Sequence, residues 1–162
     1  MTYIPIFETP SFDRSIGSMT NPSSMSANQK IPISISGFNH SGITNSSGTL
    51  TINANKSVIL VASTYMEIQY PGGDAVAVCQ WYDVTNSSWI GIPHRKAMSV
   101  SSAVNTYAYS NEFSRAILIT SSQIEVEYRI KSILEGTSGD LNGFVQSQES
   151  NYGEPWFSII SF

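Results

Sequence analysis

SVILVASTYMEIQYPGGDAVAVCQWYDVTNSSWIG, residues 57–91, is the stretch that decides the fold of this chain. Its first half alternates with a period of two, so that one face would carry Val58, Leu60, Ala62, Thr64, Met66 and Ile68. Because successive side chains of a β-strand point to opposite faces, this alternation predicts a long strand with one buried face. The PGGD segment at 71–74 ends the strand, since proline and paired glycines interrupt regular structure.

Two further strands follow in the same stretch. The pattern predicts them over residues 75–83 and 89–92, with a polar turn at 84–88 between them and Pro93 closing the second. We therefore expect three consecutive antiparallel strands to form the centre of an all-β domain, with the chain's last eight residues as their partner strand.

Strand signals continue on both sides of this centre. The clearest is residues 123–133, whose inward face would be Ile124, Val126, Tyr128 and Ile130 and whose outward face would be Glu125, Glu127, Arg129 and Lys131. Shorter strands are expected near residues 31–35, 49–53, 113–120 and 155–162, and an irregular one over 97–109, where a short helix is the competing interpretation. About eight to ten strands without a convincing helical period indicate an antiparallel β-sandwich or jelly roll.

Composition and charge exclude several classes of protein. Charged residues make up 12% of the 162, about half the usual fraction, and the net charge of −4 argues against binding nucleic acid. No apolar run approaches the roughly 20 residues of a membrane span, and the first residues lack the pattern of a signal peptide. We expect a soluble protein made in the cytosol, with no nucleic acid or membrane partner, whose single Cys79 is a buried free thiol.

Catalytic and metal-binding patterns are weak. The two histidines, His40 and His94, both lie beside turn residues, and no nucleophile elbow is present. Glu125 and Glu127 are interpreted as part of a solvated charge ladder rather than as paired catalytic acids. The segment 140–143 offers Asp140 and Asn142 before a glycine, a fragment of a calcium loop that is by default a plain turn. We expect no enzymatic activity, no cofactor and no metal site.

The two ends of the chain carry apolar residues. Residues 1–30 are predicted to be an extended N-terminal arm and linker that docks on its own domain or on a neighbour, through Tyr3, Ile4, Ile6 and Phe7. Residues 31–162 would form the domain. The last strand, PWFSIISF at 155–162, predicts burial in a central sheet position or in a subunit interface, because chain ends are usually polar.

The order of these segments resembles the C1q/TNF-like jelly roll, and particularly its copies in bacteriophage structural proteins. The resemblance covers about residues 31–162 and rests on QWYD at 80–83, EVEYR at 125–129 and WFSII at 156–160. It implies a compact homotrimer with the last strand beside the trimer axis. The interface residues that it implies are Trp156, Phe157, Ile159 and Phe162.

This resemblance leads to two hypotheses about function. The first is a virion structural protein of a bacteriophage, made in the host cytoplasm, that decorates or cements the capsid exterior and contacts the major capsid protein or other virion proteins. The second is the receptor-binding tip of a tail fibre that recognises host surface glycans through a candidate ligand loop with Tyr82, Asn86 and Trp89. The competing interpretation of Trp81 and Trp89 is that both are packing anchors.

Overall fold

Period-two alternation produces strands throughout the described part of the chain. The structure is a computed structural model that describes residues 13–19, 26–35, 40–64, 66–69, 74–99, 106–108, 113–135, 140–143 and 156–162. Within these residues there are thirteen strands and no helix, and hence no helix long and apolar enough to cross a membrane. The strands are β1 (Asp13–Met19), β2 (Ile33–Ser34), β3 (Ile43–Ser46), β4 (Thr49–Ile52), β5 (Ser57–Ser63), β6 (Met66–Gln69), β7 (Asp74–Asp83), β8 (Ser88–Ser99), β9 (Thr106–Ala108), β10 (Ser114–Ile119), β11 (Ile124–Glu135), β12 (Asp140–Gly143) and β13 (Trp156–Ser161).

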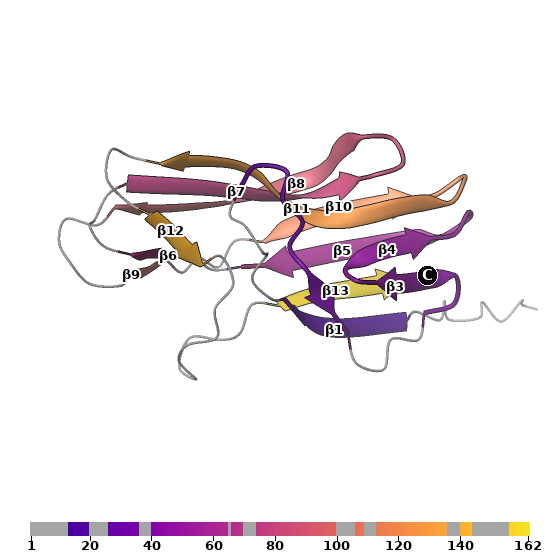
Figure 1. Cartoon of the computed structure of the whole chain (residues 1–162). Coiled ribbons are helices and arrows are strands. Elements are labelled where there is room, and N and C mark those ends of the chain that lie inside the picture. Colours follow the sequence, from indigo (N-terminus) through magenta and orange to yellow (C-terminus); the bar gives the residue numbers. More distant parts are fainter. Residues whose placement is uncertain are drawn as a thin grey trace, which may run out of the picture.

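Ten of these strands follow one another in the order β2-β1-β13-β5-β10-β8-β7-β11-β4-β3, and they fold over into two layers (Figure 1). The first layer is β2, β1, β13, β5 and β10, and the second is β8, β7, β11, β4 and β3. The layers join where Arg115 of β10 pairs with Ile92 of β8. A small sheet, β12-β6-β9, lies at one end of the sandwich. The predicted all-β antiparallel jelly roll is confirmed.

The core lies between the two layers. Trp81 of β7 and Tyr128 of β11 are fully buried, with ring centroids 5.1 Å apart, and Phe157 of β13 faces them from the first layer's side of the core. Burying each such side chain contributes roughly 1.5–3 kcal/mol, so burial of the apolar strand faces stabilises the packing of the two layers against each other. The predicted inward residues Ile124, Val126, Tyr128 and Ile130 are all buried, as are Val58, Leu60 and Ala62.

The last strand occupies a central position in the first layer. β13 pairs antiparallel with β1 on one side and with β5 on the other, so that Ile159 lies opposite both Ser15 and Leu60. The expected pairing of residues 57–63 with the end of the chain is therefore confirmed. β5 pairs with β10 on its other edge, however, and not with β7. The predicted meander of three consecutive strands is wrong at this point, because alternation defines which face is buried but not which strand lies alongside.

The single long strand expected over 57–70 is also divided in two. β5 ends at Ser63, and β6 begins at Met66 in the separate three-stranded sheet. Between them Thr64 is buried, with its Oγ1 3.4 Å from Nδ1 of His94. The hydrogen bond between Thr64 and His94 is therefore located at the point where the chain passes from the first layer to the small sheet.

β8 does not end at Pro93 as predicted but continues to Ser99. Its register against β7 shifts between Trp81, which pairs with Ile90, and Cys79, which pairs with His94, so residues 91–93 form a bulge. Proline is tolerated there because a bulge releases its residue from the ladder. The buried Gln80 side chain satisfies one bulge carbonyl and the carbonyl before it, since its Nε2 donates to the oxygens of Gly91 at 2.9 Å and Ile90 at 3.3 Å.

The predicted arm, residues 1–30, contains a strand of the sandwich. β1 lies between β2 and β13, so the domain begins before residue 31 and the predicted boundary is wrong. The sequence did not predict this strand because two of its three inward residues, Ser15 and Gly17, are small, and Met19 is the only large one. A Cβ at Gly17 would lie 2.6 Å from Cζ of Phe157, so glycine leaves room for that ring. Residues 28–31, within and just after the predicted linker, lie alongside β11 and are hydrogen-bonded to its backbone. For example, the N–H of Ile31 donates to the carbonyl oxygen of Tyr128 at 2.9 Å.

Gly91 is expected to be the residue of the β8 bulge that is most sensitive to substitution. Its φ is 72°, and a Cβ there would lie 2.7 Å from Cα of Ala116 and would clash with the Arg115 carbonyl. We predict that Gly91→Ala lowers the free energy of unfolding by about 1–3 kcal/mol, as measured by urea denaturation. Ser88→Ala, at an exposed site of the same hairpin, is the control and should change stability little. Equal stability of the two variants would contradict this account of the bulge.

Candidate interaction surface

Exposed apolar side chains gather on the outer face of the first layer, away from the core. In the described part of the chain, the large hydrophobic residues that are 48–84% exposed are Ile16, Ile92, Phe113, Ile117, Ile119 and Phe162. All of them lie on the strands of this layer, at their ends, or on β8 where it pairs with β10. We call this surface the apolar face.

Register places these residues beside one another. The half-buried Ile59 of β5 lies between Ile160 of β13 and Ile117 of β10. At the end where the chain leaves β13, the backbone N–H of Phe162 donates to Ser57, which pairs with Ile119. A patch of large aliphatic groups continuous across three strands is unusual on an isolated soluble chain and marks an interaction site.

The four predicted interface residues of the last strand fall on both of its faces. Phe157 and Ile159 are fully buried inside the chain, so their side chains cannot contact a neighbour and this part of the prediction is wrong. Trp156 is half-buried with its ring centroid 5.6 Å from that of Phe113, and Phe162 is exposed. Alternation is the reason, since residues of one strand that differ by an odd number face opposite sides.

Sequence reasoning missed the apolar residues of β10. The segment FSRAILIT at 113–120 was recognised as a strand, and it places Ile117 and Ile119 on the face opposite Ala116. The sequence does contain a signal for these residues: after Arg115, both faces of the strand carry apolar side chains. This pattern is typical of strands that are covered on both sides.

The outer face of the second layer has a different chemistry. The rings of Tyr82 and Trp89 meet edge to face, with centroids 4.9 Å apart, as β7 and β8 bring them into register. Asn86, the third residue of the candidate ligand loop, is held by Asp83 instead: its backbone N–H and its Nδ2 donate to the two carboxylate oxygens at 2.9 and 2.7 Å. Asn86 therefore shapes the turn, and the aromatic pair is what this face presents.

Two cations lie over this aromatic pair. The guanidinium carbon of Arg129 is 4.2 Å from the centroid of the Tyr82 ring, and Nζ of Lys131 is 5.4 Å from that of Trp89. Nζ of Lys131 also donates to Oε1 of Gln80 at 2.7 Å. Cation–π contacts of this kind hold the charged groups in fixed positions on the sheet.

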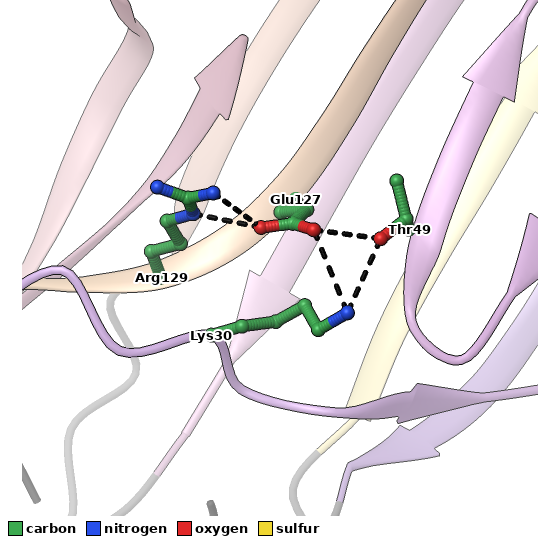
Figure 2. A network of polar contacts seen from close by, with 4 residues as sticks. All are labelled: Lys30, Thr49, Glu127 and Arg129. Carbon is green, nitrogen blue, oxygen red and sulfur yellow. Dashed lines mark hydrogen bonds and ion pairs between the residues drawn. The ribbon is translucent and has the colours of Figure 1, made fainter. Parts of the chain in front are cut away.

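Glu127 anchors the same face and is buried, unlike the solvated charge expected from the sequence (Figure 2). Its Oε1 accepts a hydrogen bond of 2.6 Å from Thr49 and lies 3.5 Å from Nζ of Lys30, while its Oε2 accepts from Nε of Arg129 at 2.8 Å. Burial alone would raise the pKa of Glu127, but the hydrogen bonds from Thr49 and Arg129 and the positive charges of Arg129 and Lys30 together lower it. The network ties residues 28–31 to β4 and β11.

His40 connects three segments at the other edge of the sandwich. It is buried, with Nδ1 2.8 Å from Oγ of Ser161 and Nε2 2.8 Å from Oγ of Ser15. Burial lowers the pKa of His40, and the nearby Asp13 opposes that shift only in part. The contacts fasten the turn before β3 to β1 and β13.

The buried residues His94 and Cys79 lie opposite each other on β8 and β7, and the predicted buried thiol is confirmed. Burial also raises the pKa of the Tyr128 hydroxyl, whose neighbours include Thr64, Ser114 and Cys79. These groups form a polar cluster inside the core.

The remaining predictions concern the N-terminal residues and the segment 140–143. Tyr3, Ile4, Ile6 and Phe7 lie outside the described residues. The segment 140–143 is strand β12, paired with β6, rather than the expected turn. Among the residues that the structure describes, no group of three His, Cys, Asp or Glu side chains could hold a metal ion.

Comparison with known proteins identifies the fold. No family model and no curated protein matches the sequence. Among solved structures, Eiger TNF from S. frugiperda is similar with a TM-score of 0.51 and 8% identity, covering 93% of this chain and 92% of that one. Murine APRIL at pH 5.0 has a TM-score of 0.49 and 8% identity, with 93% and 100% coverage. The fold is a TNF-like jelly roll.

The neutral, buried His40 predicts acid sensitivity. Folding lowers the pKa of His40. Below about pH 6.5 the unfolded chain therefore binds a proton at this histidine that the folded chain does not bind, and the free energy of unfolding falls as the pH drops through that range. His40→Gln should be less stable at pH 7.5 by about 1 kcal/mol, yet lose less stability than the unsubstituted protein between pH 7.5 and 5. Urea denaturation at constant ionic strength measures both, and parallel losses in the two proteins would contradict the assignment.

Proposed function

We propose that this chain is a non-enzymatic structural protein that assembles as a homotrimer through the apolar face. The observation that carries the proposal is that the exposed large hydrophobic side chains of the described residues all lie on one face of the sandwich. Copies of one chain usually associate around a closed symmetry axis, and the resemblance to C1q/TNF-like jelly rolls implies that three copies do so here.

The proportions of the apolar face support this assembly. It extends over β1, β13, β5 and β10 and carries both the aromatic pair Phe113–Trp156 and the aliphatic row Ile160–Ile59–Ile117. A stable interface buries about 800 Å² on each partner with an apolar centre, and aromatic and aliphatic side chains in register across several strands suit that requirement. In the trimer, β13 would lie beside the axis, with Phe162 and Trp156 contributing from its two ends.

We place the trimer on the exterior of a bacteriophage virion, as a decoration or cement protein of the capsid. Three observations support this proposal. The QWYD, EVEYR and WFSII segments resemble those of C1q/TNF-like jelly rolls in bacteriophage structural proteins. The fraction of charged residues is low, 12%, and apolar residues lie near the N-terminus. Tyr3, Ile4, Ile6 and Phe7 would reach the major capsid protein or an adjacent subunit. The mechanism is passive, since buried area between neighbours would raise the resistance of the shell to internal pressure.

The second candidate function is a receptor-binding tip of a tail fibre that recognises host surface glycans. The aromatic pair of Tyr82 and Trp89 favours it, because the pair lies on the second layer and would stay accessible in a trimer formed by the first. Localising the protein in intact particles by electron microscopy separates the two candidates: density spread over the capsid supports decoration, and density at the fibre ends supports the tip.

Ile117→Glu tests the trimer directly. The side chain is 66% exposed in the single chain and central in the apolar face, so a carboxylate there would lose its hydration among apolar side chains in the trimer. We predict that the variant is a folded monomer and that self-association weakens at least about a hundredfold, measured by light scattering across a concentration series. Ser88→Glu places the same charge on the second layer and should remain trimeric. A monomeric unsubstituted protein would overturn the proposal.

Deletion of residues 1–12 tests the predicted arm contacts without removing β1. We predict that the truncated protein still forms a trimer but no longer cosediments with capsids that lack the endogenous protein. Replacing Tyr3, Ile4, Ile6 and Phe7 together by alanine should give the same loss, because apolar contacts would carry the attachment. Full capsid binding by either variant would remove the arm from the proposal and leave the trimer untouched.

A further inference from the structure

Four of the eight basic residues of the chain lie on the outer face of the second layer and its edge. Arg129 and Lys131 belong to β11, Arg95 to β8, and Lys30 to the segment that extends the β11 edge. Arg95 is exposed and lies opposite Val78, which in turn pairs with Ser132, the neighbour of Lys131. We call these four residues the cationic face.

The carboxylates on this surface, Glu125 and Glu127, offset only part of the charge of the four cations. Glu127 is buried and already engaged by Thr49, Lys30 and Arg129. Glu125 lies farther along β11, where its backbone N–H donates to Thr85 of the 84–88 turn, two positions beyond Glu127. The cationic face is therefore locally positive on a chain whose net charge is −4, and it would attract anions.

The cationic groups are held in place by their neighbours. Arg129 is fixed by Glu127 on one side and by the Tyr82 ring beneath it, and Lys131 is fixed by Gln80 and Trp89. The guanidinium of Arg129 has N–H donors besides those that contact Glu127, and the ammonium of Lys131 has N–H donors besides the one that bonds Gln80. Positively charged donors that are ordered beforehand bind anionic groups at a lower cost in side-chain entropy.

We infer that the outer face of the second layer binds an acidic polysaccharide, with Arg95, Arg129 and Lys131 contacting its carboxylate or sulfate groups and the Tyr82–Trp89 pair contacting its sugar rings. This gives the glycan of the second candidate function a chemical class, and it holds whether or not the chain trimerises.

A saccharide fits this surface better than an acidic peptide does. Peptides that bind to sheets usually add a strand at an open edge, but Tyr82 lies on β7, which is paired with β8 on one side and β11 on the other, and β11 lies between β7 and β4. What remains accessible is a flat face of side chains. A sugar ring offers an apolar C–H surface together with hydroxyl groups, which matches half-buried aromatic rings flanked by cationic donors.

The experiment measures binding of the full chain to four immobilised probes by biolayer interferometry. The probes are polygalacturonate (carboxylate sugar), dextran sulfate (sulfate sugar), dextran (neutral sugar) and polyglutamate (acidic peptide). We expect binding to one or both acidic polysaccharides that weakens as salt rises from 50 to 300 mM, and at least tenfold weaker binding to dextran and to polyglutamate. The two acidic probes identify which anionic group is preferred.

Two matched double variants locate the site. Arg95→Gln with Lys131→Gln should weaken polysaccharide binding at least tenfold. Arg14→Gln with Lys56→Gln removes one arginine and one lysine elsewhere and should leave binding within about twofold. Trp89→Ala should weaken binding to the polysaccharide without altering the net charge. Light scattering and thermal unfolding of each variant verify that the oligomer and the fold are unchanged.

Several outcomes would overturn the inference. Equal losses in both double variants would mean that only net charge matters, and polyglutamate binding as tight as polysaccharide binding would exclude sugar recognition. Binding to dextran alone would refute the acidic class while leaving glycan recognition by the tip intact. Absence of binding to every probe would remove the site altogether, and the trimer would stand or fall separately by the Ile117→Glu result.

Discussion

The pairing of β13 with both β1 and β5 is the interaction on which the rest of the structure depends. It joins Trp156–Ser161 to strands that lie about a hundred or more residues earlier in the chain, and it places Phe157 and Ile159 in the core. The same register turns Ile160 outward beside Ile59. Loss of β13 would therefore open the core and divide the apolar face at once. Contacts so distant in sequence are costly in chain entropy and are repaid only when the whole layer forms.

The two layers share one core but differ on their outer faces. The first layer exposes large aliphatic and aromatic groups, whereas the second carries the Glu127 network and the cations over Tyr82 and Trp89. The buried carboxylate of Glu127 is stabilised by Thr49, Arg129 and Lys30. Because a buried charge needs such partners, this network allows a carboxylate to lie on the second layer at a low cost in stability. This asymmetry is the basis for proposing assembly through the first layer and recognition through the second.

Particular residues show why part of the fold could be predicted from the sequence. β11 was predicted almost completely, because Ile124, Val126, Tyr128 and Ile130 alternate with charged residues. β1 was missed, because its inward positions include Ser15 and Gly17, whose small side chains leave room for a histidine and a phenylalanine from elsewhere. Pro93 suggested a strand end, but the β8 bulge and the Gln80 side chain satisfy the interrupted ladder.

The sequence by itself determined that the chain is all-β and which apolar residues of its amphipathic strands are buried, because these follow from period-two alternation along single strands. Only the tertiary structure decided which strands are neighbours, that Phe157 and Ile159 serve the core while Ile117 and Ile119 are exposed, and that Arg129 and Lys131 stand over Tyr82 and Trp89. The physical reason is that alternation records the side to which a residue points, whereas pairing, register and bulges depend on segments far apart in the chain.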